Sequence, residues 1–342
     1  MKAMVLKRVT SLIENRSPLE LVNVPVPVPG DRELLIRVSV CGVCHTELDE
    51  IEGRTPPSIL PIVPGHQIIG RVERRGNNSQ KFKDDERVGI AWIHYACGTC
   101  KFCKNGMENL CDDFMATGRD ADGGYAEYTV VHEDFAYRIP ERFSDAQAAP
   151  LLCAGAIGYR SLRLSGMHDG EHIGLTGFGA SAHLVLKMVK HLYPRTGIYV
   201  FSRTEQERNF AKELGAAWSG DTGEESPVKL HAIIDTTPAW KPVVDAMRSL
   251  EKGGRLVINA IRKEERDKDI LSNLDYPKDL WMEKEVKSVA NITRQDVDDF
   301  LKLAADIPII PEIQEYQLDD ANTALLELKD RKIRGAKVLR IA

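Results

Sequence analysis

The sequence predicts an α/β protein with two domains, the first rich in β-strands and the second built on a parallel, doubly wound sheet. Before about residue 147, short β-forming runs are separated by Pro, Gly, Asp and Asn, as in all-β regions. After Pro150, strand-like and helix-like segments alternate, which is the pattern of parallel strands joined by crossover helices. A chain of 342 residues is also too long for one compact core and fits two domains.

Residues 1–147 are expected to form an all-β, partly open barrel, with the cysteine-rich segment 95–113 as an excursion from it. The segment Pro25–Asp31 (PVPVPGD) is expected to be a loop, because its prolines exclude a helix. The strand candidates are short β-forming runs bounded by turn residues. They are Leu34–Val40, Ile68–Glu73, Glu86–Ile90 and Tyr125–Val131.

Residues 148–294 are expected to form the doubly wound sheet, because their strands and helices alternate. The expected strands are His172–Thr176, Ile198–Phe201, His231–Asp235 and Arg255–Asn259, with one more inside Glu283–Ile292. The expected helices are Ala154–Leu164, a segment running through Lys190, Glu205–Leu214 and Val243–Leu250. Residues 295–342 add helices at Gln295–Ala305 and Leu318–Leu328 and a closing strand at Ala336–Ile341, which suits the first domain better than the sheet.

Composition and charge argue for a cytoplasmic enzyme. The net charge of −5 and the pI near 6.0 disfavour a nucleic-acid or membrane-surface role, which normally needs a basic face. The first residues contain no apolar core of a signal peptide, and the longest apolar run, near Ala148–Ile157, is too short to span a bilayer.

Four cysteines, Cys97, Cys100, Cys103 and Cys111, form the strongest local pattern in the chain. They are separated by two, two and seven residues. Four thiolates complete the closed tetrahedron of a structural zinc site. A disulfide cluster is the alternative, but dense disulfides are typical of small secreted domains, and this chain is neither small nor led by a signal peptide.

A glycine-rich turn follows the strand expected at His172–Thr176 and precedes a helix, which is the context of a dinucleotide-binding turn. The turn consists of Gly177, Phe178, Gly179, Ala180, Ser181 and Ala182. The first glycine allows the tight turn, the second admits a pyrophosphate, and the helix N-terminus supplies free N–H groups. A plain tight turn is the alternative if the motif stands alone.

The end of the next strand bears on the choice of nucleotide. An NAD enzyme usually has Asp or Glu at this point to hold the ribose hydroxyls. Here Ser202 and Arg203 follow the strand, so no carboxylate at the strand end repels a 2′-phosphate and a guanidinium can pair with one. This pattern favours NADP(H) over NAD(H). Alternatively, Arg203 is a solvated loop residue and Ser202 tolerates either cofactor.

Three further residues, Cys44, His66 and Cys153, match the Cys₂His set of a catalytic zinc site, which leaves the fourth tetrahedral position open. About 20 and then 87 residues separate them, so spacing alone does not show that they converge. Each alone would more often be a buried thiol or a core histidine. Cys41 is assigned to that structural class.

Taken together, these motifs resemble the zinc-dependent alcohol dehydrogenases of the medium-chain dehydrogenase/reductase superfamily. The matching stretches are GVCHTEL at Gly42–Leu48, PGHQIIG at Pro64–Gly70, the four-cysteine segment, APLLCAGAIGYRSL at Ala149–Leu162, GFGASAH at Gly177–His183 and LGA at Leu214–Ala216. The stretch KSVANITRQDVDDFLKLAADIPIIP also resembles a bacterial branch of broad-range and cinnamyl-type enzymes. The resemblance implies a GroES-like catalytic domain, a Rossmann cofactor domain, two zinc ions per chain and a homodimer or homotetramer.

The resemblance also implies roles for individual residues. Cys44, His66 and Cys153 would bind the catalytic zinc, and the four-cysteine segment the structural zinc. Thr46 would bond the alcohol oxygen and begin a proton relay, and His45 would lie near the cofactor pyrophosphate. Glu47 stands where the family usually has an Asp that orients the histidine ligand. Trp92 falls where related enzymes wall the substrate pocket, although a core aromatic is an equal alternative.

Three positions depart from the family pattern. Gln67 replaces the glutamate that usually follows the histidine ligand, and Asp49 replaces a histidine that often ends the proton relay. Ile157 stands where a threonine often contacts the nicotinamide. None of these removes a metal ligand or Thr46, so activity is expected to survive.

The expected reaction is reversible hydride transfer between NAD(P)(H) and a primary alcohol or its aldehyde. Two alternatives are a zinc-free quinone or enoyl reductase of the same superfamily and a non-catalytic cofactor-binding relative. The two sets of possible zinc ligands disfavour the first alternative, and these ligands together with Thr46 disfavour the second.

Overall fold

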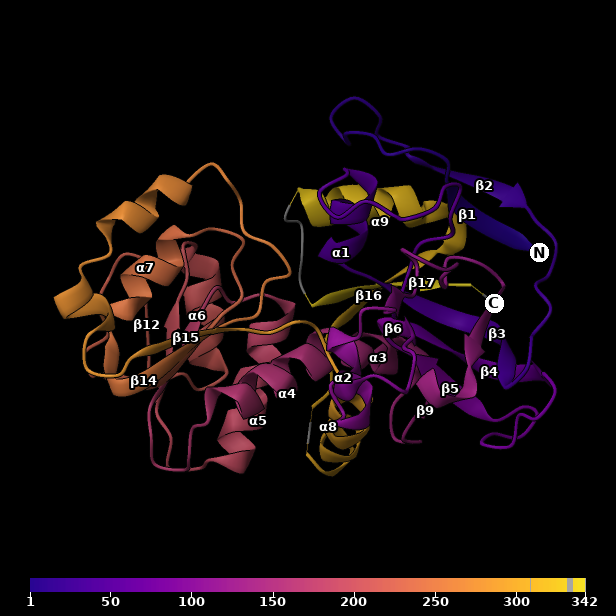
Figure 1. Cartoon of the computed structure of the whole chain (residues 1–342). Coiled ribbons are helices and arrows are strands. Elements are labelled where there is room, and N and C mark those ends of the chain that lie inside the picture. Colours follow the sequence, from indigo (N-terminus) through magenta and orange to yellow (C-terminus); the bar gives the residue numbers. More distant parts are fainter. Residues whose placement is uncertain (308, 331–334, 342) are drawn as a thin grey trace. The chain divides into compact units, whose positions relative to one another are not determined.

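A computed structural model describes residues 1–307, 309–330 and 335–341, so that residues 308, 331–334 and 342 of the expected return segment lie outside the described residues. The chain divides into two compact units (Figure 1). Unit 1 contains Met1–Cys153 and the chain from Thr293 onward, and unit 2 contains Ala154–Ile292. Among the described residues, none of the helices combines the length and the apolar character that a membrane span requires.

Unit 1 is built on a β-sheet that the C-terminal strands complete. Its strands are β1 (Lys2–Leu6), β2 (Leu19–Asn23), β3 (Glu33–Val43), β4 (Ile68–Arg75), β5 (Arg87–Ile90), β6 (Ile93–Tyr95), β7 (Met115–Ala116), β8 (Tyr128–His132), β9 (Ala136–Arg138), β16 (Ile313–Gln317) and β17 (Ala336–Arg340). The main sheet has the order β16-β17-β3-β4-β5-β9, and β8 also pairs with β3. Strand β17 pairs antiparallel with β3, with Leu339 opposite Cys41, so the closing strand is part of the unit 1 sheet. Figure 1 shows β16 and β17, from the yellow end of the chain, joining this indigo-to-magenta sheet.

The expectation that residues 1–147 are all-β is wrong, because this region also contains helices. The helical elements of unit 1 are α1 (His45–Ile51), α2 (Lys101–Lys104), α3 (Asp145–Ala148), α8 (Arg294–Asp306) and α9 (Ala321–Lys329), with 3₁₀ turns at Glu108–Leu110, Glu133–Phe135, Ala149–Leu152 and Leu318–Asp320. Helix α1 forms because Cys44 caps its N-terminus and the Glu47 side chain bonds back to the Cys44 amide. Leu48 and Ile51 then bury one face of the helix in the core.

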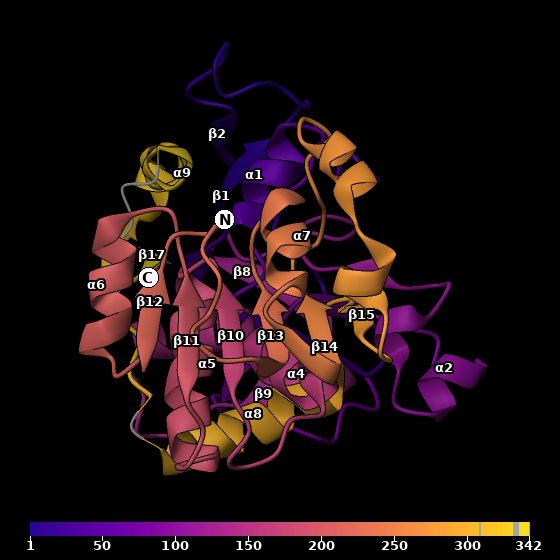
Figure 2. The ribbon, with the colours of Figure 1, turned by 90° about the vertical axis from the view of Figure 1, so that its left-hand side faces the viewer.

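Unit 2 is a parallel, doubly wound sheet, as the alternating pattern predicted. Its strands are β10 (Ile173–Thr176), β11 (Ile198–Phe201), β12 (Trp218–Gly220), β13 (Leu230–Asp235), β14 (Leu250–Ile258) and β15 (Glu285–Ser288). They pair in the order β12-β11-β10-β13-β14-β15, all parallel, and Figure 2 shows the first five side by side. The three-residue strand β12 was not predicted from the sequence.

The helices of unit 2 cover this sheet. They are α4 (Ala154–Ser165), α5 (Ala180–Leu192), α6 (Glu205–Glu213) and α7 (Lys241–Met247), with a 3₁₀ segment at Lys268–Asn273 and a π-helical turn at Tyr276–Leu280. Helix α6 ends before Gly215, whose φ of +97° suits glycine, as expected. Met247 of α7 packs with Ile233 and Leu256 in one apolar cluster.

The strand order reverses between β10 and β13, and ligands of doubly wound sheets bind outside the carboxyl ends of the strands at such a point. The two strand ends are tied together there, because the Thr176 hydroxyl donates to the buried Asp235 carboxylate at 2.5 Å. Lys263 pairs with the same carboxylate and donates to the carbonyls of Thr237 and Ala239 at 2.8 and 3.0 Å. This network anchors the segment that follows β14 at the ligand-binding edge of the sheet.

Candidate functional site

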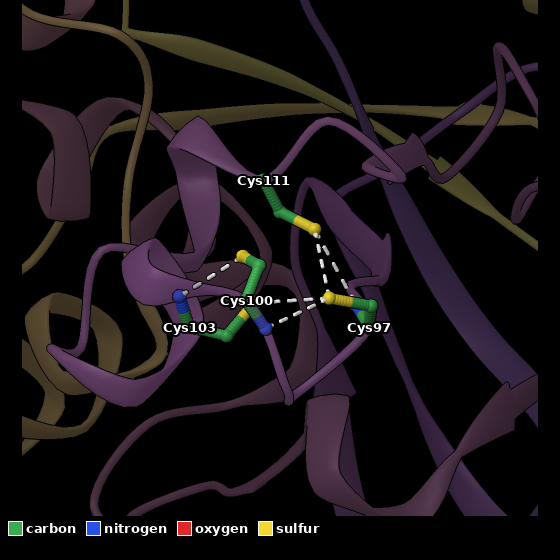
Figure 3. A group of neighbouring side chains, drawn as sticks. All are labelled: Cys97, Cys100, Cys103 and Cys111. Carbon is green, nitrogen blue, oxygen red and sulfur yellow. Dashed lines mark hydrogen bonds between the residues drawn. The ribbon is translucent and has the colours of Figure 1, made fainter.

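The thiols of the four cysteines Cys97, Cys100, Cys103 and Cys111 converge on one point of unit 1 (Figure 3). All four sulfur atoms lie within 4.8 Å of one another. The Cys97 Sγ lies 3.5 Å from the Cys111 Sγ and 4.0 Å from the Cys103 Sγ. A disulfide would bring two sulfurs to about 2 Å, so these thiols are free.

These separations fit a tetrahedral zinc ion. With Zn–S bonds near 2.3 Å, the sulfurs of a tetrahedron lie roughly 3.8 Å apart, and the observed distances bracket that value. Backbone amides also point at the sulfurs: the amides of Cys100 and Cys103 each donate to the preceding thiol of the group at 3.4 Å. Hydrogen bonds from the Thr99 amide and hydroxyl and the Cys100 amide lower the pKa of Cys97 to about 6, which favours the thiolate.

The scattered trio Cys44, His66 and Cys153 also converges, although three separate segments of unit 1 supply it. Cys44 caps α1, His66 lies just before β4, and Cys153 follows the 3₁₀ turn Ala149–Leu152. The three possible ligand atoms lie within 4.8 Å of one another, and the two sulfurs are 4.0 Å apart. The hydrogen bond between the two sulfurs lowers the pKa of the Cys44 thiol and raises the pKa of the Cys153 thiol.

Glu47 fixes the orientation of this trio. Its Oε1 lies 2.6 Å from His66 Nδ1, and its Oε2 accepts from the Cys44 amide at 2.7 Å. Both side chains are almost fully buried, with 0% and 1% exposure for Glu47 and His66. His66 Nε2 has no partner, although it is buried. The unpartnered nitrogen and the two thiols are the donor set that zinc prefers, with one tetrahedral position left open.

The remaining predicted residues of this region lie on α1. The Thr46 hydroxyl is 3.6 Å from the Cys44 sulfur, which places it at the edge of the trio. Asp49 is buried and its Oδ1 accepts from Arg54 Nε at 2.5 Å. His45 is exposed. Asp49 therefore already has a cationic partner.

Two further residues surround the trio, one of which sequence reasoning missed. Trp92 is buried and its ring meets the His66 ring edge-on, with centroids 5.0 Å apart, so it adjoins the possible metal ligand. Glu50 was missed. It is 2% exposed, its Oε1 has no partner, and burial followed by the Glu47 charge raises its pKa well above the usual range. Its position one turn after Glu47 on α1 was the only available signal.

In unit 2, the turn Gly177–Ala182 adopts the geometry that a dinucleotide needs. Gly177 has a φ of +77°, and a Cβ there would lie 2.8 Å from the Thr236 hydroxyl. A Cβ on Gly179 would project into open space, which leaves the backbone accessible to a phosphate, and the first turn of α5 has no side-chain cap. Ala182 is buried against the sheet, and Phe178 packs edge-on against Phe210.

A carboxylate from helix α6 reaches the end of β11, which the sequence did not predict. The hydroxyl of Ser202 donates to Oε2 of Glu207, which lies in the first turn of α6. Arg203 is exposed beside it. The preference for NADP(H) was predicted from the absence of a carboxylate at the strand end, but the neighbouring helix supplies one. The signal was not recognisable in the sequence because Glu207 lies five residues beyond Ser202.

Comparisons with known proteins agree with this geometry. Residues 30–141 match the family model described as an alcohol dehydrogenase GroES-like domain. The chain is 40% identical to the probable alcohol dehydrogenase AdhA of Mycobacterium tuberculosis (strain CDC 1551 / Oshkosh) over 95% of this chain and 93% of that protein. It is 31% identical to an alcohol dehydrogenase of Geobacillus stearothermophilus, covering 96% of this chain and 97% of that one. Among solved structures, a cinnamyl alcohol dehydrogenase of Sorghum bicolor matches with a TM-score of 0.83 and 26% identity over 99% of this chain and 97% of that chain.

Proposed function

The chain belongs to the zinc-type medium-chain alcohol dehydrogenases, and on that basis we propose that it transfers a hydride reversibly between a nicotinamide dinucleotide and a primary alcohol or its aldehyde. The observation that carries the proposal is the convergence of Cys44, His66 and Cys153, with His66 Nε2 unpartnered and aimed by Glu47. A three-donor set with an open fourth position is the arrangement of a catalytic zinc rather than a structural one.

Each group of residues has a separate task in this proposal. Cys44, His66 and Cys153 hold the catalytic zinc, and the four-cysteine segment holds the structural one. The turn Gly177–Ala182 binds the dinucleotide pyrophosphate, with His45 as a further phosphate contact and Ser202 and Arg203 at the adenosine ribose. When bound, zinc would supply Lewis-acid polarisation of the substrate oxygen and the nicotinamide would supply the hydride chemistry.

Residues of α1 transfer the proton that is released or taken up together with the hydride. Thr46 hydrogen-bonds the alcohol oxygen and passes its proton outward. Asp49 lies one turn further along the same helix and receives the proton. Its Oδ1 is paired with Arg54 Nε, which fixes the position of the carboxylate. Glu47 acts through His66, because it contacts only that ring and the Cys44 amide in the interactions described above.

A zinc-free quinone or enoyl reductase of the same superfamily is the second candidate, followed by a cofactor-binding relative without catalysis. Neither needs a buried histidine held by a carboxylate against two free thiols. Metal analysis combined with an aldehyde-dependent oxidation assay for NADH and NADPH separates the three. We expect two zinc ions per chain and turnover of primary aldehydes. Zinc-free protein that reduces a quinone, or protein that binds cofactor without turnover, would contradict the proposal.

We further propose a homodimer or homotetramer that forms through the edge of the unit 2 sheet. Strand β15 ends the sheet, and all four of its residues are exposed. Val286 on this strand and Trp281 before it are 48% and 54% exposed. Unpaired strand edges with apolar side chains are prone to pair with another chain. The molar mass from light scattering should correspond to a dimer or a larger oligomer. The Val286→Lys variant should have a smaller molar mass.

A further inference from the structure

Two residues of opposite charge, Arg203 and Glu207, lie at the adenosine end of the proposed cofactor site. Glu207 is half-buried in the first turn of α6, whereas Arg203 is exposed at the end of the β11 segment. Ser202, between β11 and Arg203, is buried, and its hydroxyl donates a hydrogen bond to the Glu207 carboxylate. The carboxylate is thereby fixed at the strand end, where a doubly wound sheet binds the ribose of a dinucleotide.

The local structure holds Glu207 in this position by two independent contacts. The Thr204 hydroxyl caps α6 and accepts from the Glu207 amide at 3.2 Å, which sets the rotation of the first turn. The side chain then reaches back to Ser202. Arg208 does not neutralise it, because its Nη1 donates to the carbonyls of Ser202 and Arg203 at 2.7 and 3.0 Å and lies 3.5 Å from the Asp221 carboxylate.

We infer that Glu207 is a cofactor-selectivity residue, acting from the helix in place of a strand-end carboxylate: it accepts the ribose 2′-hydroxyl of NAD(H) and opposes the 2′-phosphate of NADP(H). Arg203 acts in the opposite direction, as a cation that a 2′-phosphate attracts. The two charges then have opposite effects on the relative affinity of the site for NAD(H) and NADP(H), and removing either one changes that ratio. This inference rests on the proposed dehydrogenase function, because it assumes that the turn Gly177–Ala182 binds a dinucleotide.

The test compares Glu207→Gln with Arg203→Gln in the full-length, zinc-loaded enzyme. Dissociation constants for NADH and NADPH are measured by fluorescence titration without substrate, and kcat/KM is measured for the same cofactors with an aldehyde. Glu207→Gln should raise the preference for NADPH over NADH by about tenfold in both measurements, as expected when one like-charge contact is removed from a half-buried site. Arg203→Gln should lower the same ratio.

Glu205→Gln is the matched control. Glu205 is exposed in the same first turn of α6 and loses the same charge, so solvent screening should keep its effect on the ratio below about twofold. Equal ratios for Glu207→Gln and Glu205→Gln would overturn the inference while leaving the dehydrogenase proposal intact. A wild-type enzyme that binds neither dinucleotide would instead overturn the proposed function on which the inference rests.

Discussion

The two cysteine-containing sites of unit 1 differ in how the chain assembles them. The four-cysteine segment brings its sulfurs together within fifteen residues, around the short helix α2. The trio Cys44, His66 and Cys153 needs three segments that the folded unit must first bring together. Four thiols close a tetrahedron and exclude substrate, whereas three donors leave one position open. The pattern most visible in a sequence can therefore be the one furthest from the chemistry.

The surroundings of the two sites differ in the same sense. His66 and Glu47 are almost fully buried and are bonded to each other, so the trio is held rigidly before any ligand arrives. In the four-cysteine segment, backbone amides of the segment itself contact the sulfurs of Cys97 and Cys100. We therefore expect variants of the trio to affect turnover and variants of the four-cysteine segment to affect stability.

The largest effect on turnover is expected from Cys153→Ser. Serine is a poor zinc ligand, so the variant should lose the metal at the open site and with it several kcal/mol of transition-state stabilisation, or at least about a thousandfold in kcat. Zinc per chain should fall from two to one. Metal analysis and steady-state kinetics measure the two quantities, and retention of both zinc ions with normal turnover would remove the trio from the mechanism.

Cys41→Ala is the control for that variant. Cys41 is a fully buried free thiol of β3, three residues before Cys44, but it lies outside both groups of possible metal ligands among the described residues. Its replacement should leave two zinc ions per chain and change kcat by less than about threefold, with a small loss of stability from the cavity.

Glu47→Ala should have the next largest effect. The carboxylate orients His66 and caps α1, so its loss should weaken zinc binding at the trio by about 10- to 100-fold. Competition with a chromogenic chelator measures this affinity for the two sites separately, since the four-cysteine site should release its zinc unchanged. Glu47→Gln keeps an oxygen near His66 Nδ1 and should recover part of the loss. Equal zinc release from both sites would indicate a general loss of structure.

The sequence predicted the unit 2 sheet well, because alternating strands and helices are a local pattern. It did not predict helix α1, whose cap and apolar face are short and lie among β-forming runs. The ligands of both proposed zinc sites could be named from motifs, but their convergence could not be derived from spacing. Glu50 and Glu207 were missed for another reason. Each lies on a helix, and a single sequence does not show which neighbouring segment a helical side chain faces.

A smaller effect is expected for Asp49→Asn. Asp49 is paired with Arg54 and acts only after Thr46 in the proposed proton relay. Removing its charge should lower kcat by less than about tenfold, whereas Thr46→Val should lower it by about a hundredfold or more because the substrate oxygen loses its proton acceptor. The pH profile of kcat for both variants measures the difference. A larger loss for Asp49→Asn than for Thr46→Val would assign the main proton transfer to Asp49.

The smallest effect on turnover is expected for Cys100→Ser. Unlike Cys153→Ser, this variant should lose stability but keep its turnover. This variant should also lose one zinc ion per chain, but a site with four thiol ligands has no open position for a substrate. The kcat of the remaining folded enzyme should therefore stay within about threefold of the wild type, while loss of a structural metal lowers the free energy of unfolding by about 4 kcal/mol or more. Thermal unfolding and kinetics on the same sample measure both. Cys100→Ser and Cys153→Ser should each lose one zinc ion per chain. An equal loss of turnover in both variants would show that the four-cysteine segment shapes the open site. The distinction between a stabilising zinc site and a catalytic one would then be wrong.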